Sequence, residues 1–237
     1  MLRNFPLVVG LLSPGTTMPD TTPDTITVES MPSVSSHDRI LRSAKRLFAR
    51  NGYENTSTVA IAREAGTSES QLMKHFGSKQ GLLLAIFDRG WAAIMERVQA
   101  SHRPASPADR LMSMLQAMII EVDNDPDLKQ LMALEARRVR KDNRDVLLSR
   151  GYQQFSELVH GLLGEMRDHG HLHPDVNLDA VRAAILGMTE GLLRDQVVAE
   201  RSECRADYTG DDIRKLLEIM LPALSNHAMP PLKAVSR

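Results

Sequence analysis

The sequence predicts an all-α protein, in which a short helix-turn-helix near the N-terminus precedes a longer set of helices. Apolar residues recur at intervals of three and four from residue 38 to residue 224, which is the spacing of one face of a helix. No stretch alternates apolar and polar residues as a half-buried strand does, and no internal repeat is visible. The apolar content of 42% and charged content of 25% in 237 residues are ordinary for a globular protein.

The helix-turn-helix is predicted between Asp38 and Leu84. A first helix, from Asp38 to Arg50, presents an apolar face and stops before Gly52. A second, shorter apolar face stops at Gly66, because glycine adopts a left-handed backbone without steric cost. The residues of these two faces are Ile40, Leu41, Ala44, Leu47 and Phe48, then Ile61, Ala62 and Ala65.

The third helix is predicted to start at Ser68, which has the spacing of a capping box with Gln71. Leu72 and Phe76 face inward, whereas the outward residues are polar: Glu69, Ser70, Gln71, Lys74 and His75. A short polar helix that follows a glycine turn is suited to the major groove of DNA. Ser78 then caps a fourth helix, at whose N-terminus Lys79 is placed to meet a phosphate.

This segment resembles the DNA-binding domain of the TetR/AcrR family of bacterial transcriptional regulators. The matching positions are Gly52-Tyr53, Thr56-Ser57, Ile61-Ala62, Ala65-Gly66-Thr67-Ser68, Leu72, His75-Phe76, Ser78-Lys79 and Leu82-Leu83. The chain departs from the family at Met73, where a tyrosine that touches a phosphate is usual. The resemblance and the spacing together predict these DNA-binding residues: Thr56, Ser57, Thr67, Ser68, Ser70, Gln71, Lys74, His75 and Lys79.

The charge distribution fits this interpretation, although the net charge of the chain is only −1. From His37 to Gly81 there are eight basic residues against four acidic ones, a balance of +4. Positive charge is therefore concentrated where phosphates would be neutralised. A segment of this length also reaches such a balance by chance, so the charge alone does not establish DNA binding.

The remaining features predict a cytoplasmic protein. The single cysteine, Cys204, excludes an internal disulfide, and no apolar run is long enough to span a membrane. The apolar stretch from Phe5 to Leu12 is too short and too interrupted for a signal peptide. We expect residues 1–35 to form a disordered arm, 36–84 the DNA-binding domain, 85–228 a second helical domain and 229–237 a flexible tail.

Five further helices are expected after a long one that continues from Ser78 to about Gln99. They start at Ser106-Pro107, Asp125-Pro126, Val146, Leu178 and Ile213, the first with a serine cap followed by proline. The resemblance implies that they form a domain that binds a small-molecule effector and makes a homodimer. A dimer would let the protein read a palindromic operator.

The last two helices are the predicted dimer interface. One of them carries a heptad-like apolar seam beside a strip of small residues, which permits close approach of another helix. The alternative is that the strip packs on a helix of the same chain. The predicted interface residues are Leu178, Val181, Ala184, Ile185, Gly187, Met188, Gly191, Leu192, Leu216 and Met220.

The effector pocket is expected among methionine-rich and aromatic helices, since methionine adapts to varied apolar shapes. The predicted lining residues are Trp91, Met95, Met112, Met118, Met132, Tyr152 and Phe155; ordinary core packing is the alternative for each. Because these helices are apolar and carry few obvious charges, the effector should be largely apolar with one polar handle. No cofactor is expected.

Other functions are less well supported. His169, His171 and His173, between Asp168 and Asp175, have the ligand types of a metal site but lack its usual spacing; solvated histidines are the alternative. The basic run from Arg137 to Arg144 is either a solvated helix end or a second nucleic-acid patch. No catalytic motif is present, so an enzyme is not expected. The main alternative is a helix-turn-helix protein whose second domain binds a protein partner.

Overall fold

The fold is that of a computed structural model, which describes residues 35–100, 106–135, 148–202 and 206–223. Throughout this part of the chain the regular structure is helical. The helices are α1 (Ser36–Asn51), α2 (Thr58–Glu64), α3 (Glu69–Phe76), α4 (Lys79–Ala100), α5 (Pro107–Asp123), α6 (Pro126–Glu135), α7 (Arg150–Asp168), α8 (Leu178–Ala199) and α9 (Gly210–Ala223). The all-α prediction is confirmed.

Short polar residues set where the helices begin. The predicted caps form at Ser68, Ser78 and Ser106, whose hydroxyls accept the N–H groups of residues three positions on, at 3.2, 2.9 and 3.4 Å. Each such contact satisfies one N–H that the helix itself leaves unpaired. At the turn between α2 and α3, Gly66 has a φ of 62°, the left-handed conformation expected there.

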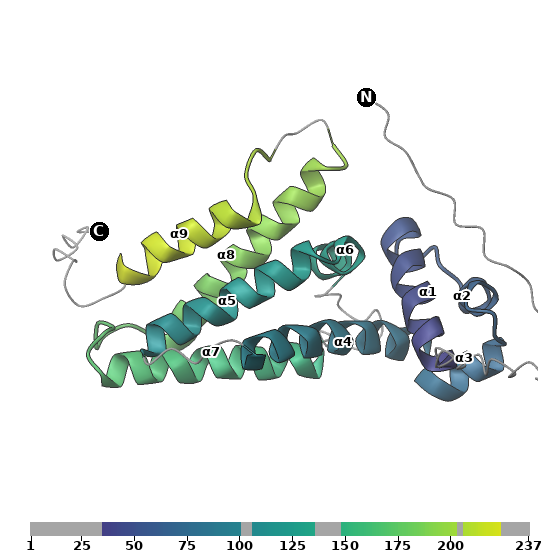
Figure 1. The fold of residues 1–237 in the computed structure, drawn as a ribbon, viewed down its shortest axis with the longest axis horizontal. Helices are drawn as coiled ribbons and strands as arrows, with labels where there is room; N and C mark the ends of the chain where they lie inside the picture. Colours follow the sequence, from purple (N-terminus) through teal and green to yellow (C-terminus); the bar gives the residue numbers. More distant parts are fainter. Residues whose placement is uncertain (1–34, 101–105, 136–147, 203–205, 224–237) are drawn as a thin grey trace, which may run out of the picture. The chain divides into compact units, whose positions relative to one another are not determined.

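Helices α1 and α3 pack against α4, and α2 packs on α1 and α3 (Figure 1). The fully buried side chains at the centre of this group are Ile40, Phe48, Ile61, Leu72 and Leu82. Each side chain of this size contributes about 1.5–3 kcal/mol when removed from water. Helix α4 then continues without a break past residue 84 and into the second group of helices.

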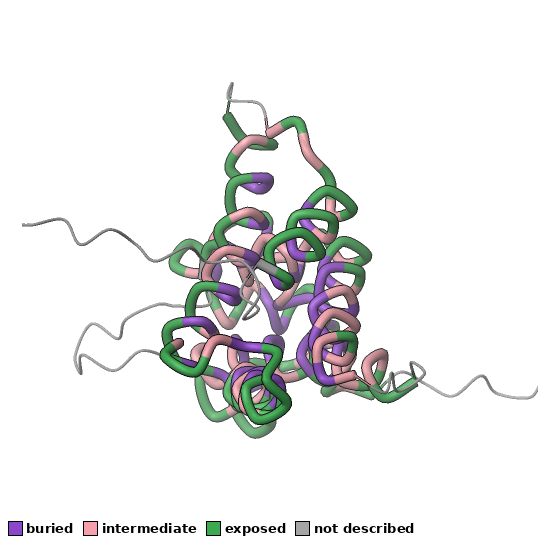
Figure 2. Tube along the Cα trace, turned by 90° about the vertical axis from the view of Figure 1, so that its left-hand side faces the viewer, coloured by how far each residue is buried: buried purple, intermediate pink, exposed green. Residues whose placement is uncertain are grey.

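In that second group α4, α5 and α7 lie side by side, with α8 against α7 and α9 against α5. Figure 2 shows their buried residues turned towards one another and the exposed residues outward. The start of α7 touches α4 very closely, because a Cβ added to Gly151 would lie 2.2 Å from the Cβ of Trp91. Only glycine permits this approach.

Two helix starts differ from the prediction. Helix α7 begins at Arg150 and not at Val146, because the Ser149 hydroxyl accepts the N–H of Tyr152 at 3.2 Å and caps the helix there. Helix α9 begins at Gly210, three residues before Ile213. The backbone N–H and the hydroxyl of Thr209, the residue before the helix, both donate to the Asp212 carboxylate in its first turn. The predicted arm and tail, the basic run after Arg137, Val146 and Cys204 lie outside the described residues.

Candidate nucleic-acid interface and ligand pocket

The exposed surface of α3 brings together three of the predicted DNA-binding side chains. Ser70, Gln71 and Lys74 are all exposed, and none has a side-chain hydrogen bond or ion pair with a described residue. Only half of the predicted capping box forms. The Ser68 hydroxyl accepts the Gln71 N–H, but the Gln71 amide stays free to bond elsewhere. An amide and an ammonium on one exposed face can donate to base edges and phosphates.

Two serines extend this surface along the helix N-termini. The Ser57 hydroxyl accepts the N–H of Ala60 at 3.1 Å, as Ser68 does for Gln71. A hydroxyl that accepts in this way still has its own proton to donate. Each serine can therefore cap its helix and reach a phosphate. Thr67 is half-buried in the turn between α2 and α3.

Thr56 belongs to the fold and not to the surface. Its side chain is 2% exposed, and its hydroxyl lies 2.9 Å from the carbonyl oxygen of Gly52 and 3.2 Å from that of Leu47. The hydroxyl proton is used in closing the end of α1, so we remove the Thr56 side chain from the set of DNA contacts. The sequence could not show this, because the direction of the hydroxyl depends on how α1 packs.

Lys79 and His75 are each held by neighbours that the sequence reading missed. The Lys79 ammonium lies 4.4 Å from the centre of the Tyr53 ring and donates to the carbonyl oxygen of Glu54 at 3.3 Å. The His75 ring lies 3.2 Å from the Ser36 hydroxyl and 5.7 Å from the His37 ring, edge to face. The protein therefore fixes both side chains before any DNA is bound.

Helix α1 is in turn held by other helices. Asp38 pairs with Arg89 of α4 at 3.2 Å. The hydrogen bond from the Ser35 hydroxyl, followed by the charges of Arg89 and His37, lowers the pKa of the Asp38 carboxyl. Near the other end of α1, Lys45 pairs with Asp125, which also caps α6 by accepting the Leu128 N–H at 3.1 Å.

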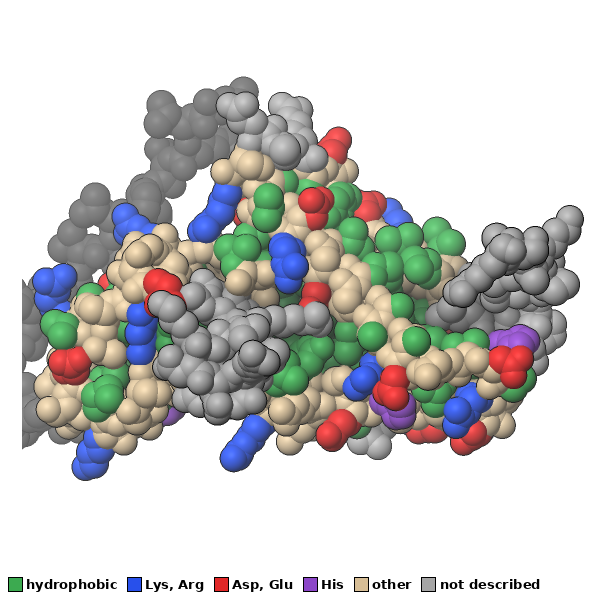
Figure 3. All heavy atoms as spheres, turned by 180° about the vertical axis from the view of Figure 1, so that it is seen from behind, with side chains coloured by type: hydrophobic (Ala, Val, Ile, Leu, Met, Phe, Trp, Pro, Cys, Tyr) green, Lys and Arg blue, Asp and Glu red, His purple; other side chains and the backbone are tan. Residues whose placement is uncertain are grey.

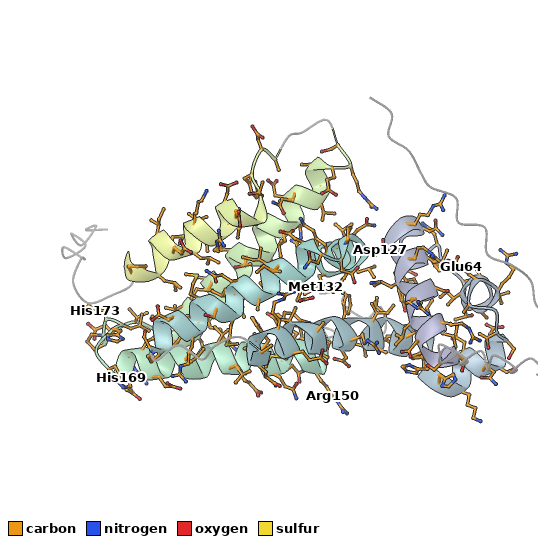
Figure 4. All side chains as sticks on the ribbon, in the orientation of Figure 1. Glu64, Asp127, Met132, Arg150, His169 and His173 are labelled. Carbon is orange, nitrogen blue, oxygen red and sulfur yellow. The ribbon has the colours of Figure 1, made fainter. Side chains whose placement is uncertain are left out.

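A small cavity between α4, α5, α6, α7 and α8 coincides with part of the predicted effector pocket. Trp91, Met118, Met132 and Tyr152 line it, but its free volume is only about 40 Å³. Met132 lies on α6, inside the second group of helices (Figure 4). Three predicted lining residues lie elsewhere. Phe155 is fully buried with its ring 5.0 Å from that of Trp91, and Met95 and Met112 pack against the core.

The cavity also contains polar residues that the sequence reading missed. Lys129 and Glu190 both line it, beside Ser149. The Lys129 ammonium pairs with Asp123 at 2.8 Å, and its side chain is 13% exposed. Lys129 and Glu190 are the two charged residues among the cavity's lining residues, and the rest of the lining is mostly apolar, as expected. The sequence could not show that Lys129 and Glu190 line the same cavity, because the two residues lie on helices far apart in the chain.

The predicted dimer residues divide into two sets. Leu178, Val181 and Ile185 are buried within the subunit. In contrast, Ala184 and Gly191 are exposed, and a Cβ added to Gly187 or Gly191 would meet nothing within 4 Å. Gly187, Met188 and Leu192 are half-buried, and Leu216 and Met220 are exposed, as is Ile219, which the prediction omitted.

An apolar groove of about 440 Å³ runs between α8 and α9, with Met188, Leu217 and Met220 among its lining residues. Figure 3 shows hydrophobic side chains gathered over the α8–α9 part of the face seen from behind. The small-residue strip thus packs on no other helix of the described chain.

The three histidines that were weighed as metal ligands are His169, His171 and His173. Across the described residues, no group of three or more His, Cys, Asp or Glu side chains is placed to hold a metal ion. His169 and His173 lie at the α7–α8 connection, at the end of α7 away from α1 (Figure 4).

No helix of the described part is long and apolar enough to cross a bilayer.

Comparison with known proteins gives the family. Residues 40–86 match the family described as "Bacterial regulatory proteins, tetR family". The HTH-type transcriptional regulator UidR of Escherichia coli strain K12 is 24% identical over 174 residues, 73% of this chain and 85% of UidR. The HTH-type transcriptional repressor AcnR of Corynebacterium efficiens is 23% identical over 68% of this chain and 81% of its own.

The fold is similar to that of solved transcriptional regulators. The structure of the transcriptional regulator FadR from Bacillus subtilis in complex with stearoyl-CoA superposes with a TM-score of 0.63 at 18% identity, covering 81% of this chain and all of FadR. The matched segment holds α2, α3 and the first part of α4, with most of α1. The chain belongs to the TetR family of transcriptional regulators, which bind DNA and are not enzymes.

Proposed function

We propose that this regulator is a homodimeric repressor that binds a palindromic operator and is released from it by a small, largely apolar ligand. The observation that carries this proposal is the exposed apolar surface of α8 and α9. A second copy on this surface would cover the groove and the exposed Leu216, Ile219 and Met220. Dimerisation would also place the two α3 helices so that each could enter one of two half-sites about 34 Å apart.

On DNA, α3 is proposed to enter the major groove with Gln71 and Lys74 towards base edges and nearby phosphates. Gln71 is the best candidate for reading an adenine, which an amide can contact through two hydrogen bonds. Ser57, Ser68 and Lys79 would hold the phosphate backbone. We take residues 36–84 as the DNA-binding domain and residues 85–228 as the effector and dimerisation domain.

The ligand is proposed to enter the cavity beside Trp91. Ligand sites have volumes of about 300–1,000 Å³, so the free volume of about 40 Å³ must expand. Leu148, which is 39% exposed, and the half-buried Met132 are the lining side chains that have room to move. The stearoyl-CoA in FadR supports a ligand with a long apolar part. Lys129 or Glu190 would bind its polar handle.

The experiment is to replace Gly191 by leucine and to measure the oligomeric state by sedimentation. Within one subunit a Cβ added at residue 191 would meet nothing within 4 Å, so the variant should fold, whereas a partner helix would be pushed away. We expect monomers without operator binding. Gly161→Leu is the matched control, because Gly161 is also an exposed helical glycine with nothing within 4 Å; it should remain a dimer.

In both variants, leucine favours the helix over glycine by up to about 1 kcal/mol, so both should fold. Gly161→Leu should show no loss of thermal stability, whereas Gly191→Leu should lose only the stabilisation that association gives the dimer. A Gly191→Leu protein that sediments as an intact dimer would contradict the proposed interface.

A further inference from the structure

Two large apolar side chains are exposed among the described residues of the proposed DNA-binding domain. They are Val59 in the first turn of α2, 59% exposed, and Met73 in α3, 41% exposed. Every other exposed large apolar side chain of the described chain lies at residue 120 or later. Single exposed apolar residues are common, but Met73 stands between the inward Leu72 and the outward Lys74 on the helix proposed to read DNA.

The position of Met73 on α3 is defined by its neighbours one turn earlier. Residues three and four apart share a helix face, so Met73 adjoins Glu69 on one side and Ser70 on the other. The Glu69 carboxylate accepts a hydrogen bond from the Thr58 hydroxyl at the start of α2. Met73 therefore lies on the flank of α3 towards α2, beside the surface that carries Ser70 and Lys74.

We propose that Met73 contacts the C5 methyl group of a thymine in each half-site and so contributes to sequence specificity. A thioether donates no hydrogen bond and cannot hold a phosphate as Lys79 can. The thymine methyl is the apolar group that the major groove displays. It stands near the thymine's own sugar-phosphate backbone, which is where a side chain on the flank of a groove-bound helix reaches. The inference rests on the proposed docking of α3.

The expected size of the effect follows from burial of one methyl group. Removal of a methyl-sized apolar group from water is worth about 0.8 kcal/mol, which corresponds to ~4-fold in affinity for one half-site. Loss of the methyl from both half-sites should weaken binding ~15-fold if the two contacts are independent.

The test uses the full chain and an operator selected from random duplexes with it. Each thymine is replaced singly by uracil, which differs from thymine only by lacking the C5 methyl group. For the wild-type protein, replacement of one particular thymine in a half-site should weaken binding ~4-fold. For Met73→Ala, binding to the thymine duplex should be weaker, and the same replacement should have no further effect. Met73→Gln, of similar length but polar, should behave in the same way.

Val59→Ala is the matched control, because it removes the other exposed apolar side chain of the domain and should retain the ~4-fold response to uracil. Because Met73 is exposed, its variants should unfold at the wild-type temperature. If every thymine replacement affects wild type and Met73→Ala by the same factor, Met73 reads no methyl group.

A parallel measurement with Lys74→Ala separates this failure from failure of the docking. Weaker binding of Lys74→Ala without any Met73–thymine coupling would reject only the methyl contact. Unchanged binding of Lys74→Ala to every duplex would reject the docking of α3, and the Met73 proposal with it.

Discussion

Lys74 and Lys79 both belong to the proposed DNA-binding face, but the protein holds them differently. Lys74 is exposed and has no partner among the described residues, so its side chain must be ordered when DNA binds. Lys79 is already fixed by the Tyr53 ring and the Glu54 carbonyl. Ordering a long side chain costs up to about 1.5–2 kcal/mol of conformational entropy. The structure thus favours Lys79 as a preorganised phosphate contact.

Lys79→Ala should weaken binding to all duplexes and lower the slope of log affinity against log salt by about 1, because one phosphate contact is lost. Gln71→Ala should instead relax preference at one base position. Arg167→Ala, which removes a charge from the far end of α7, is the control and should change neither quantity. Filter binding or fluorescence anisotropy across a salt series measures both. Unchanged affinity and slope for Lys79→Ala would mean that the lysine does not contact DNA.

At the scale of elements, the sequence predicted helices and caps better than contacts. A cap depends on residues three positions apart, so Ser68 and Ser106 were predictable. The start of α7 was missed because Val146 and Leu147 continue the apolar spacing, while Ser149 closes the cap. The sequence analysis misjudged the role of Thr56, and it missed the contact of Tyr53 with Lys79 and the place of Glu190 in the cavity, for another reason. Their roles depend on side chains or carbonyls from other parts of the fold, which periodicity does not place.

Tyr208, in the connection between α8 and α9, makes tertiary contacts of this kind with α8. The Tyr208 hydroxyl lies 2.8 Å from the carbonyl oxygen of Leu192 and 2.9 Å from a carboxylate oxygen of Asp195. The Gln196 amide in turn donates to the Tyr208 carbonyl at 2.9 Å. Burial, and then Asp195, raise the pKa of Tyr208 to about 12. These bonds tie the last turns of α8 to the segment that leads into α9.

Tyr208→Phe should destabilise the fold by about 1 kcal/mol, the typical net value of one hydrogen bond. Because the pKa in the folded state exceeds the usual value of 10, the stabilisation is complete below pH 10 and falls as the pH rises to about 12. The difference between wild type and Tyr208→Phe in urea unfolding should therefore shrink across this range. A difference that stays constant up to pH 12 would show that the hydroxyl does not ionise in this way.

At the scale of the whole molecule, two routes connect the proposed effector cavity with the helices proposed to bind DNA. The first is α4, which carries both Lys79 and Trp91. Trp91 is pressed against Gly151, whose N–H donates to Asp88 of α4 at 3.1 Å. The second was not predicted. Gln130 of α6 and Arg201, beyond the end of α8, both donate to the Ala49 carbonyl near the end of α1. Movement of α6 around an expanding cavity would reach α1 directly.

Trp91, the only tryptophan, gives a test of the proposed switch. A ligand can release DNA only if it binds the DNA-incompetent conformation more tightly than the competent one. A molecule in the enlarged cavity would lie beside Trp91 and Tyr152, whose ring centres are 5.7 Å apart. Tilting of α4 would then change the spacing of the two α3 helices, which the duplex fixes. Any ligand found by a DNA-release assay should therefore perturb Trp91 fluorescence.

The same ligand should weaken operator binding about 5- to 150-fold, corresponding to a coupling of about 1–3 kcal/mol, and operator DNA must weaken ligand binding by that same factor. Fluorescence titration with and without operator measures the reciprocal factor. Lys79→Ala is the control, because it should weaken DNA binding at a residue away from the cavity and leave ligand affinity without DNA unchanged. A ligand that releases DNA while operator leaves its affinity untouched would rule out the switch, since thermodynamic coupling between two sites acts equally in both directions.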